Sequence, residues 1–251
     1  MRPTGLLFAL LLASTTFAQV ATPAQPQQQL SQEQIIERVC KGPEIKSGAE
    51  YDKLTRVLHR LSVIVNQDTQ HHSYVALANS DVINAWAVNA NMATSLVCVP
   101  VAMVRFMGDG DGELAFIVAH EIGHTVDDTC KTAEGRLAVA NSRGSFGALF
   151  GGLVGGQQGA IESSKVSQQR GCEARADEIG FKIFTAAGYN PFDAAGAFGR
   201  LEMYSGDTHT GILAHLSALG SDHPMTPDRI SRMRTLLLNQ EMRAAASQGA
   251  Q

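Results

Sequence analysis

Hydrophobic positions recur at helical spacing in the first folded part of the chain. Ser31 precedes an apolar pattern at positions 35, 36 and 39 and is followed by Glu33-Gln34, which is typical of a capped helix start. From Ala49 to about Leu61, leucine and valine side chains fall on one face, so a second helix is expected there.

The pattern then changes to short segments rich in β-formers. Residues 73–78, 85–88 and 93–99 are separated by Asn, Asp and Ser clusters, which predicts a small antiparallel sheet. From Glu113 the helical period returns and persists to the end, except in the Gly-rich segment 144–159. That segment is expected to be a flexible connection, with a mobile flap or a membrane-touching element as the alternative. The fold class is therefore α+β and mostly helical.

The ends of the chain carry signals of their own. Arg2, the apolar run 6–13 and the small residues at 16 and 18 predict a cleaved signal peptide over residues 1–18, because eight apolar residues are too few to span a bilayer. Residues 19–29, rich in Pro and Gln, predict a disordered lead. We expect a single folded domain over 30–245, a tail at 246–251, and a periplasmic product without a membrane-spanning segment.

The net charge and the cysteine content limit which classes of binding partner and which disulfides are expected. With 20 Lys and Arg against 24 Asp and Glu, the net charge of −4 argues against a nucleic-acid-binding protein. Four cysteines in an oxidising compartment, without a Cys-x-x-Cys spacing, favour disulfides over a cysteine metal site, although four buried thiols stay the alternative. Three connectivities are open to Cys40, Cys98, Cys130 and Cys172.

The most informative string is His120-Glu121-Ile122-Gly123-His124, which follows an apolar helical run. Histidines at i and i+4 share one helix face and can bind one Zn²⁺, and Glu121 can reach a zinc-activated water as general base. A catalytic zinc site needs a third protein ligand. Glu173 is the candidate, and Asp177, one turn later, can support a ligating histidine from behind. Alanines between these two carboxylates let two helices approach closely.

Five motifs in order make the chain similar to the HtpX and CAAX prenyl endopeptidase family of zinc metallopeptidases, and to its soluble periplasmic branch. They are Asn84-Ala85-Trp86-Ala87, His120-Glu121-Ile122-Gly123-His124, Glu173-Ala174-Arg175-Ala176-Asp177, Ala187-Gly188-Tyr189-Asn190-Pro191, and Asp222-His223-Pro224 with Arg229-Ile230. The resemblance implies a zincin-like fold, one Zn²⁺ per chain and a sheet beside the active-site helix. It also implies that the strand carrying Asn84, Ala85, Trp86 and Ala87 is the edge to which a peptide substrate adds.

The same resemblance gives roles to two residues near the C-terminus. His223 would donate to the oxyanion, or occupy the open position of the metal in a resting state. Arg229 would orient the loop of His223 or bind a substrate carboxylate. Thr226 and Pro227 predict that a helix starts just after this loop.

The predicted convergence of the two motif helices also bears on the cysteines. Cys130 follows His124 closely and Cys172 directly precedes Glu173, so both would lie on the same side of the metal site. We therefore hypothesise a Cys130–Cys172 disulfide, which would close the Gly-rich excursion and brace the third ligand.

Two classes of function follow from these residues. The first is a zinc-dependent endopeptidase that hydrolyses unfolded or misassembled envelope proteins, with Glu121 as general base. The second is a chaperone-like or scaffold protein in which zinc is structural and the site is plugged. Peripheral contact with a membrane stays open in either case.

Overall fold

The structure is a computed structural model that describes residues 30–68, 72–89, 94–127, 156–208, 223 and 226–248. Its contacts divide the chain into two units, Met1–Leu30 and Ser31–Gln251, and the elements below all belong to the second. The expected signal peptide at 1–18, the lead at 19–29 and residues 144–155 of the Gly-rich segment lie outside the described residues.

Two helices precede the sheet, as the sequence pattern predicts. Helix α1 (Gln32–Val39) starts with a capping box, in which the Ser31 hydroxyl accepts from the backbone N–H of Gln34 and the Gln34 side chain accepts from that of Ser31. Helix α2 (Ala49–Asp68) starts at the expected residue and continues two turns beyond the expected end.

The three strands are β1 (His72–Ala78), β2 (Trp86–Asn89) and β3 (Thr94–Pro100), in the order β1-β3-β2. Strands β2 and β3 pair antiparallel as predicted, but β1 and β3 pair parallel, so the sheet is mixed and the prediction of a purely antiparallel sheet is wrong for that pair. The short β2–β3 connection reverses the chain and imposes antiparallel pairing, whereas β1 reaches the far side of β3 through a crossover. The α+β class is confirmed.

The alternation of side chains gives the sheet two different faces. The inner face, with Leu77, Val97 and Val99, belongs to the main hydrophobic core together with side chains of α2 and of the helices after the sheet. The outer face, with Ala76 and Cys98, packs against α1. A disulfide between Cys40, at the end of α1, and Cys98 links these two elements covalently.

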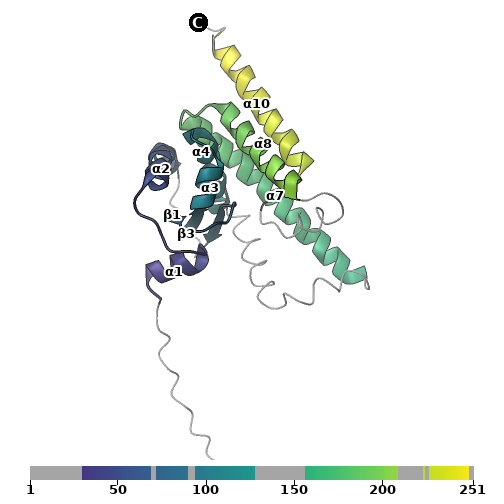
Figure 1. The fold of residues 1–251 in the computed structure, drawn as a ribbon. Coiled ribbons are helices and arrows are strands. Elements are labelled where there is room, and N and C mark those ends of the chain that lie inside the picture. The colour runs from purple at the N-terminus through teal and green to yellow at the C-terminus, as the bar shows by residue number, and fades with distance from the viewer. Residues whose placement is uncertain are drawn as a thin grey trace, which may run out of the picture. The chain divides into compact units, whose positions relative to one another are not determined.

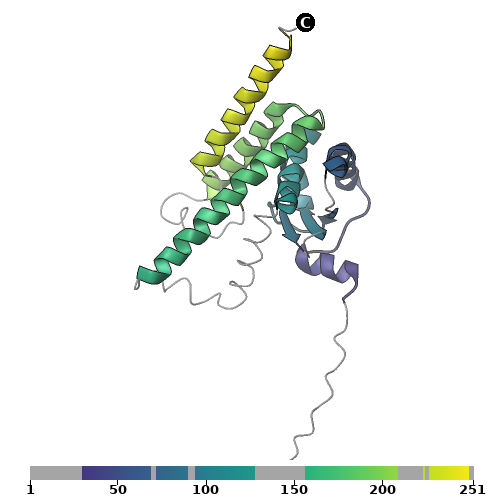
Figure 2. The ribbon, with the colours of Figure 1, turned by 180° about the vertical axis from the view of Figure 1, so that it is seen from behind.

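The described residues after the sheet are mostly helical. The helices are α3 (Val101–Phe106), α4 (Asp111–Val126), α7 (Gly156–Ala186), α8 (Pro191–Thr208) and α10 (Pro227–Gln248). Helices α4, α7, α8 and α10 lie side by side (Figure 1), and the view from behind shows the length of α7 (Figure 2). Helix α4 is buried from Leu114 to Thr125, because the sheet covers one side of it and the long helices cover the other.

Two helix boundaries test the sequence pattern further. Helix α10 begins at Pro227, and the backbone N–H of Arg229 donates to the Thr226 hydroxyl at 3.4 Å, so the predicted start is confirmed. The prediction of a loop is wrong for residues 156–159, which form the first turn of α7. Each Gly costs a helix only about 1 kcal/mol, and extending an existing helix is far easier than starting one. None of the helices in the described ranges is long and apolar enough to cross a membrane.

Candidate metal centre

Helix α4 presents two histidines to the same point inside the molecule. The side chains of His120 and His124 are 5% and 2% exposed, and their Nε2 atoms lie 3.1 Å apart. One turn of helix separates the two residues, so both rings leave the same face. Buried apolar residues of α4 lie on both sides of this stretch and exclude water from the two rings and from the neighbouring Glu121.

Helix α7 supplies a third donor because it approaches α4 unusually closely. A Cβ atom added at Gly123 would lie 2.8 Å from the backbone oxygen of Ala176, and one added at Gly180 would lie 2.8 Å from Cα of His120. Backbone therefore meets backbone at both positions. This contact brings Glu173 beside the two histidines, as the predicted approach of the motif helices requires.

The three side chains form a compact triangle of donor atoms. Oε2 of Glu173 lies 3.5 Å from Nε2 of His120, and Oε1 lies 3.3 Å from Nε2 of His124. Two ligands of a tetrahedral zinc ion, at bond lengths of roughly 2.0–2.1 Å, lie about 3.3 Å apart. The residues present therefore fit a zinc ion in spacing and in chemistry. Oε2 of the neighbouring Glu121 is buried and has no hydrogen-bond partner among the described residues.

Asp177 contacts the back of one histidine. Its Oδ1 lies 2.9 Å from Nδ1 of His120. This position favours the tautomer with the proton on Nδ1, which leaves the lone pair of Nε2 available for a metal ion between His124 and Glu173. Burial raises the pKa of Asp177, but hydrogen bonds from Arg229 and His120 outweigh it and hold that pKa below its usual value. Asp177 therefore stays ionised behind the ligand.

Arg229 reaches this region from α10 and contacts both carboxylates of α7. Its Nε and Nη2 donate to the two oxygens of Asp177 at 2.8 and 2.7 Å, and its Nη1 lies 2.9 Å from Oε2 of Glu173. The side chain is 7% exposed and its guanidinium lies 5.3 Å from the ring centre of Phe198. These contacts are with Glu173 and Asp177, and the two roles expected for Arg229, orientation of the His223 loop and contact with a substrate carboxylate, stay predictions.

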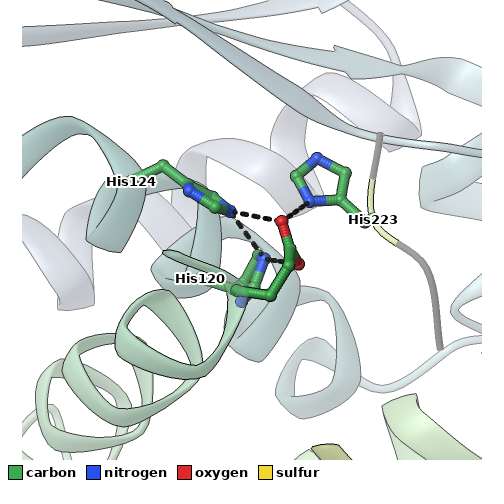
Figure 3. Close-up of side chains that lie close together, drawn as sticks. His120, His124 and His223 are labelled. Carbon is green, nitrogen blue, oxygen red and sulfur yellow. Dashed lines mark hydrogen bonds and ion pairs between the residues drawn. The ribbon is translucent and has the colours of Figure 1, made fainter. Parts of the chain in front are cut away.

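His223 completes the cluster from the segment before α10. Its Nδ1 lies 3.0 Å from Oε1 of Glu173 and its Nε2 lies 3.6 Å from Oε1 of Glu121. Figure 3 shows the rings of His120, His124 and His223 turned toward one another. Donor atoms of these histidines and of Glu173 all lie within 4.8 Å of each other. Burial lowers the pKa of His223, but the charges of Glu121 and Glu173 raise it above its ordinary value.

The expected substrate strand lies next to the metal helix but outside the cluster. Strand β2 packs against α4, Ala85 is buried, and Trp86 and Ala87 are partly buried. One edge of β2 pairs with β3, and no strand in the described ranges pairs with the other edge. Asn84 precedes β2 and is half-buried.

One contact near the site was not anticipated from the sequence. Arg175, between the two carboxylates of the α7 motif, forms an ion pair with the buried Asp127 at the end of α4. Asp127 lies three residues after His124, and this proximity to the motif was the only signal of a role. The pair fastens the C-terminal end of the histidine helix to α7.

The structure determines one of the disulfide pairings considered for the four cysteines. The Cys40–Cys98 disulfide excludes the two connectivities that would separate these residues. Cys172 is buried beside Glu173, whereas Cys130 lies outside the described residues. The Cys130–Cys172 bridge therefore stays a prediction.

Comparison with known proteins agrees with this geometry. Residues 49–237 match the model of peptidase family M48. The chain is 31% identical over 140 residues to the beta-barrel assembly-enhancing protease of Yersinia pestis, and 29% identical over 132 residues to that of Escherichia coli strain K12. These matches cover 49% and 46% of this chain, but only 26% and 25% of the relatives' own length.

Proposed function

This chain belongs to peptidase family M48 and carries a metallopeptidase domain, and we propose that it is a zinc-dependent endopeptidase. The observation that carries the proposal is the triangle of His120, His124 and Glu173 with the carboxylate of Glu121 beside it. A purely structural zinc site closes all four positions with protein ligands and needs no adjacent base.

The proposed division of labour follows from the contacts. His120, His124 and Glu173 hold the metal ion. When bound, Zn²⁺ supplies Lewis-acid chemistry, which makes water more acidic and polarises a carbonyl group. Glu121 accepts the proton of the attacking water and passes it to the leaving amine. Its buried Oε2 without a partner is suited to this role, because no other described residue competes for that lone pair.

His223 has two roles that the geometry supports. Its ring lies between Glu121 and Glu173, where an N–H can donate to the oxyanion that forms during peptide hydrolysis. In the resting state the same ring fills the space in front of the donor triangle. Substrate entry would then require the His223 ring to move.

The substrate is proposed to be an extended polypeptide. The edge of β2 that pairs with no described strand offers backbone groups for strand addition beside α4, and an extended chain is available in unfolded or misassembled proteins. The relatives' names associate them with β-barrel assembly. We therefore propose that this protein acts on unfolded or misassembled envelope proteins in the periplasm, after removal of residues 1–18.

The contact of His223 with Glu173 favours one alternative function. A site closed by this histidine could hold zinc permanently, and the protein would then be a chaperone-like or scaffold protein. A scaffold does not need a general base, so Glu121 separates the two functions.

Cleavage of casein by the zinc-loaded mature chain tests the proposal. Wild type is expected to cut, whereas Glu121→Gln at the same zinc occupancy is expected to lose activity by at least a thousandfold, since both proton transfer and electrostatic stabilisation are lost. Glu178→Gln is the matched control, because Glu178 is exposed and pairs only with Lys182 among the described contacts. Equal activity of wild type and Glu121→Gln would refute the mechanism.

A further inference from the structure

The outer face of the sheet has one covered row and one open row of side chains. In the covered row, Ala76, Cys98 and Trp86 are register partners, and α1 packs on them. The next row contains Tyr74, Leu96 and Val88, which are also register partners. In that row Tyr74 is 41% exposed and Val88 is 38% exposed. Apolar surface therefore continues from beneath α1 to the edge of β2 at which no strand of the described ranges pairs.

Trp86 is held firmly at the border between the two rows. Its register partner Cys98 is disulfide-bonded to Cys40, and Nζ of Lys41 lies 4.9 Å from the centre of the indole ring. The disulfide thus joins the end of α1, next to Lys41, to the strand that pairs with the tryptophan. The indole is partly buried, so one part of its surface is supported and another part stays accessible.

A substrate strand that adds to this edge of β2 would meet this surface with every second side chain. Successive side chains of a strand point to opposite faces, and neighbours across paired strands lie about 4.5–5.5 Å apart. Side chains of the added strand that point outward would lie beside Trp86 and Val88. Those that point inward would lie beside Ala85 and Ala87, which belong to the packed inner face of the sheet.

We propose that Trp86 and Val88 form an apolar subsite that selects substrates with large apolar side chains at alternate positions. This inference rests on the proposed peptidase function and specifies its substrate class. Alternating apolar residues are the pattern of half-buried β-strands. The enzyme would therefore favour segments that form sheets in their folded state and are extended when folding fails.

The single tryptophan of the chain makes this surface directly observable. We would titrate zinc-loaded Glu121→Gln, which cannot consume the ligand, with three ten-residue peptides. The first carries Phe at alternate positions with Ser and Thr between, the second replaces every Phe by Ser, and the third contains the residues of the first in an order without alternation. Trp86 emission reports binding at the β2 edge.

The alternating Phe peptide is expected to shift Trp86 emission to the blue and to bind at least tenfold more tightly than the other two. Val88→Thr is expected to weaken its binding roughly fourfold, because one methyl contact is lost. Tyr74→Ser is the matched control: it removes apolar surface from the same face at the far strand, and binding should change less than twofold. Equal affinities of the three peptides, or binding without an emission change, would overturn the inference.

The outcome separates this inference from the peptidase proposal. If wild type cuts casein but the three peptides bind equally, the subsite is wrong and the peptidase function stands. If the alternating peptide binds beside Trp86 but zinc-loaded wild type cuts neither casein nor that peptide, the subsite stands and the peptidase function is wrong.

Discussion

The contact between α4 and α7 predicts that a residue without any metal contact controls metal affinity. Gly180 lies on α7, and a Cβ atom there would be 2.8 Å from both N and Cα of His120. These atoms belong to the backbone of a helix that is buried on all sides, so they cannot move aside cheaply. We therefore expect Gly180→Ala to push α7 away from α4.

The size of this effect can be worked from the distances. Relief of the contact from 2.8 Å to the optimum for carbon atoms of about 3.5 Å requires a separation of roughly 0.7 Å. Metal sites tolerate deviations of about 0.2 Å in ligand distance. Overpacking costs about 1–3 kcal/mol, and the higher helix propensity of Ala recovers about 1 kcal/mol. We expect a net loss of about 1 kcal/mol in the free energy of unfolding, and a zinc Kd raised roughly 10–100-fold.

Competition with a chromophoric chelator measures the zinc Kd, and urea unfolding of the zinc-free protein measures stability. Gly171→Ala is the matched control, since Gly171 lies on the same helix and an added Cβ meets nothing within 4 Å. This control should gain stability and keep the wild-type Kd. If Gly180→Ala also keeps the wild-type Kd, close helix contact does not position Glu173 and the reasoning is refuted.

Three other perturbations have defined outcomes. Arg229→Ala leaves two buried carboxylates without their arginine and should lower the free energy of unfolding by about 3–5 kcal/mol. Arg229→Lys should recover only part of this loss, because an ammonium group cannot make the bidentate contact. An unchanged urea midpoint of Arg229→Ala would contradict this prediction. Replacing both Cys40 and Cys98 by Ser should lower the free energy of unfolding by about 4 kcal/mol, because the disulfide closes a loop with a sequence separation of 58. Urea unfolding measures this loss, and a value below about 1 kcal/mol would show that the disulfide contributes little to stability. When free zinc is present at a thousandfold excess over its Kd, adding a chelator should lower the free energy of unfolding by about 4 kcal/mol and lower Tm. A thermal unfolding scan that does not respond to the chelator would exclude tight zinc binding by the native state.

Features encoded by neighbouring residues were predictable from the sequence. The His120 and His124 pair follows from helix periodicity alone, and the starts of α1 and α10 follow from Ser31 and Thr226 with their neighbours. Glu173 was predicted from the need of a catalytic zinc site for a third ligand and from the alanines around it, because a pair of carboxylates at helical spacing by itself usually marks a solvated face.

Features that depend on how distant segments meet were not predictable. Nothing in the alternation of residues 73–78 distinguishes parallel from antiparallel pairing with β3, since both place the same side chains on the same face. The position of Arg229 is similar: a charge in the first turn of a helix is normally exposed, and only the packing of α10 against α7 buries it between Glu173 and Asp177. The pairing of Cys40 with Cys98 depends on the docking of α1 on the sheet.

Arg229 lies on α10, the last described helix, so it joins the metal site after the residues of α4 and α7. During synthesis α4 and α7 are complete before α10, and until then the Arg229 that contacts Glu173 and Asp177 is missing. Their negative charges oppose burial, so the donor triangle should close last, when the C-terminal helix docks. If the peptidase function proposed above holds, a chain that lacks α10 lacks the arginine of the site, so its activity depends on completion of the C-terminal helix.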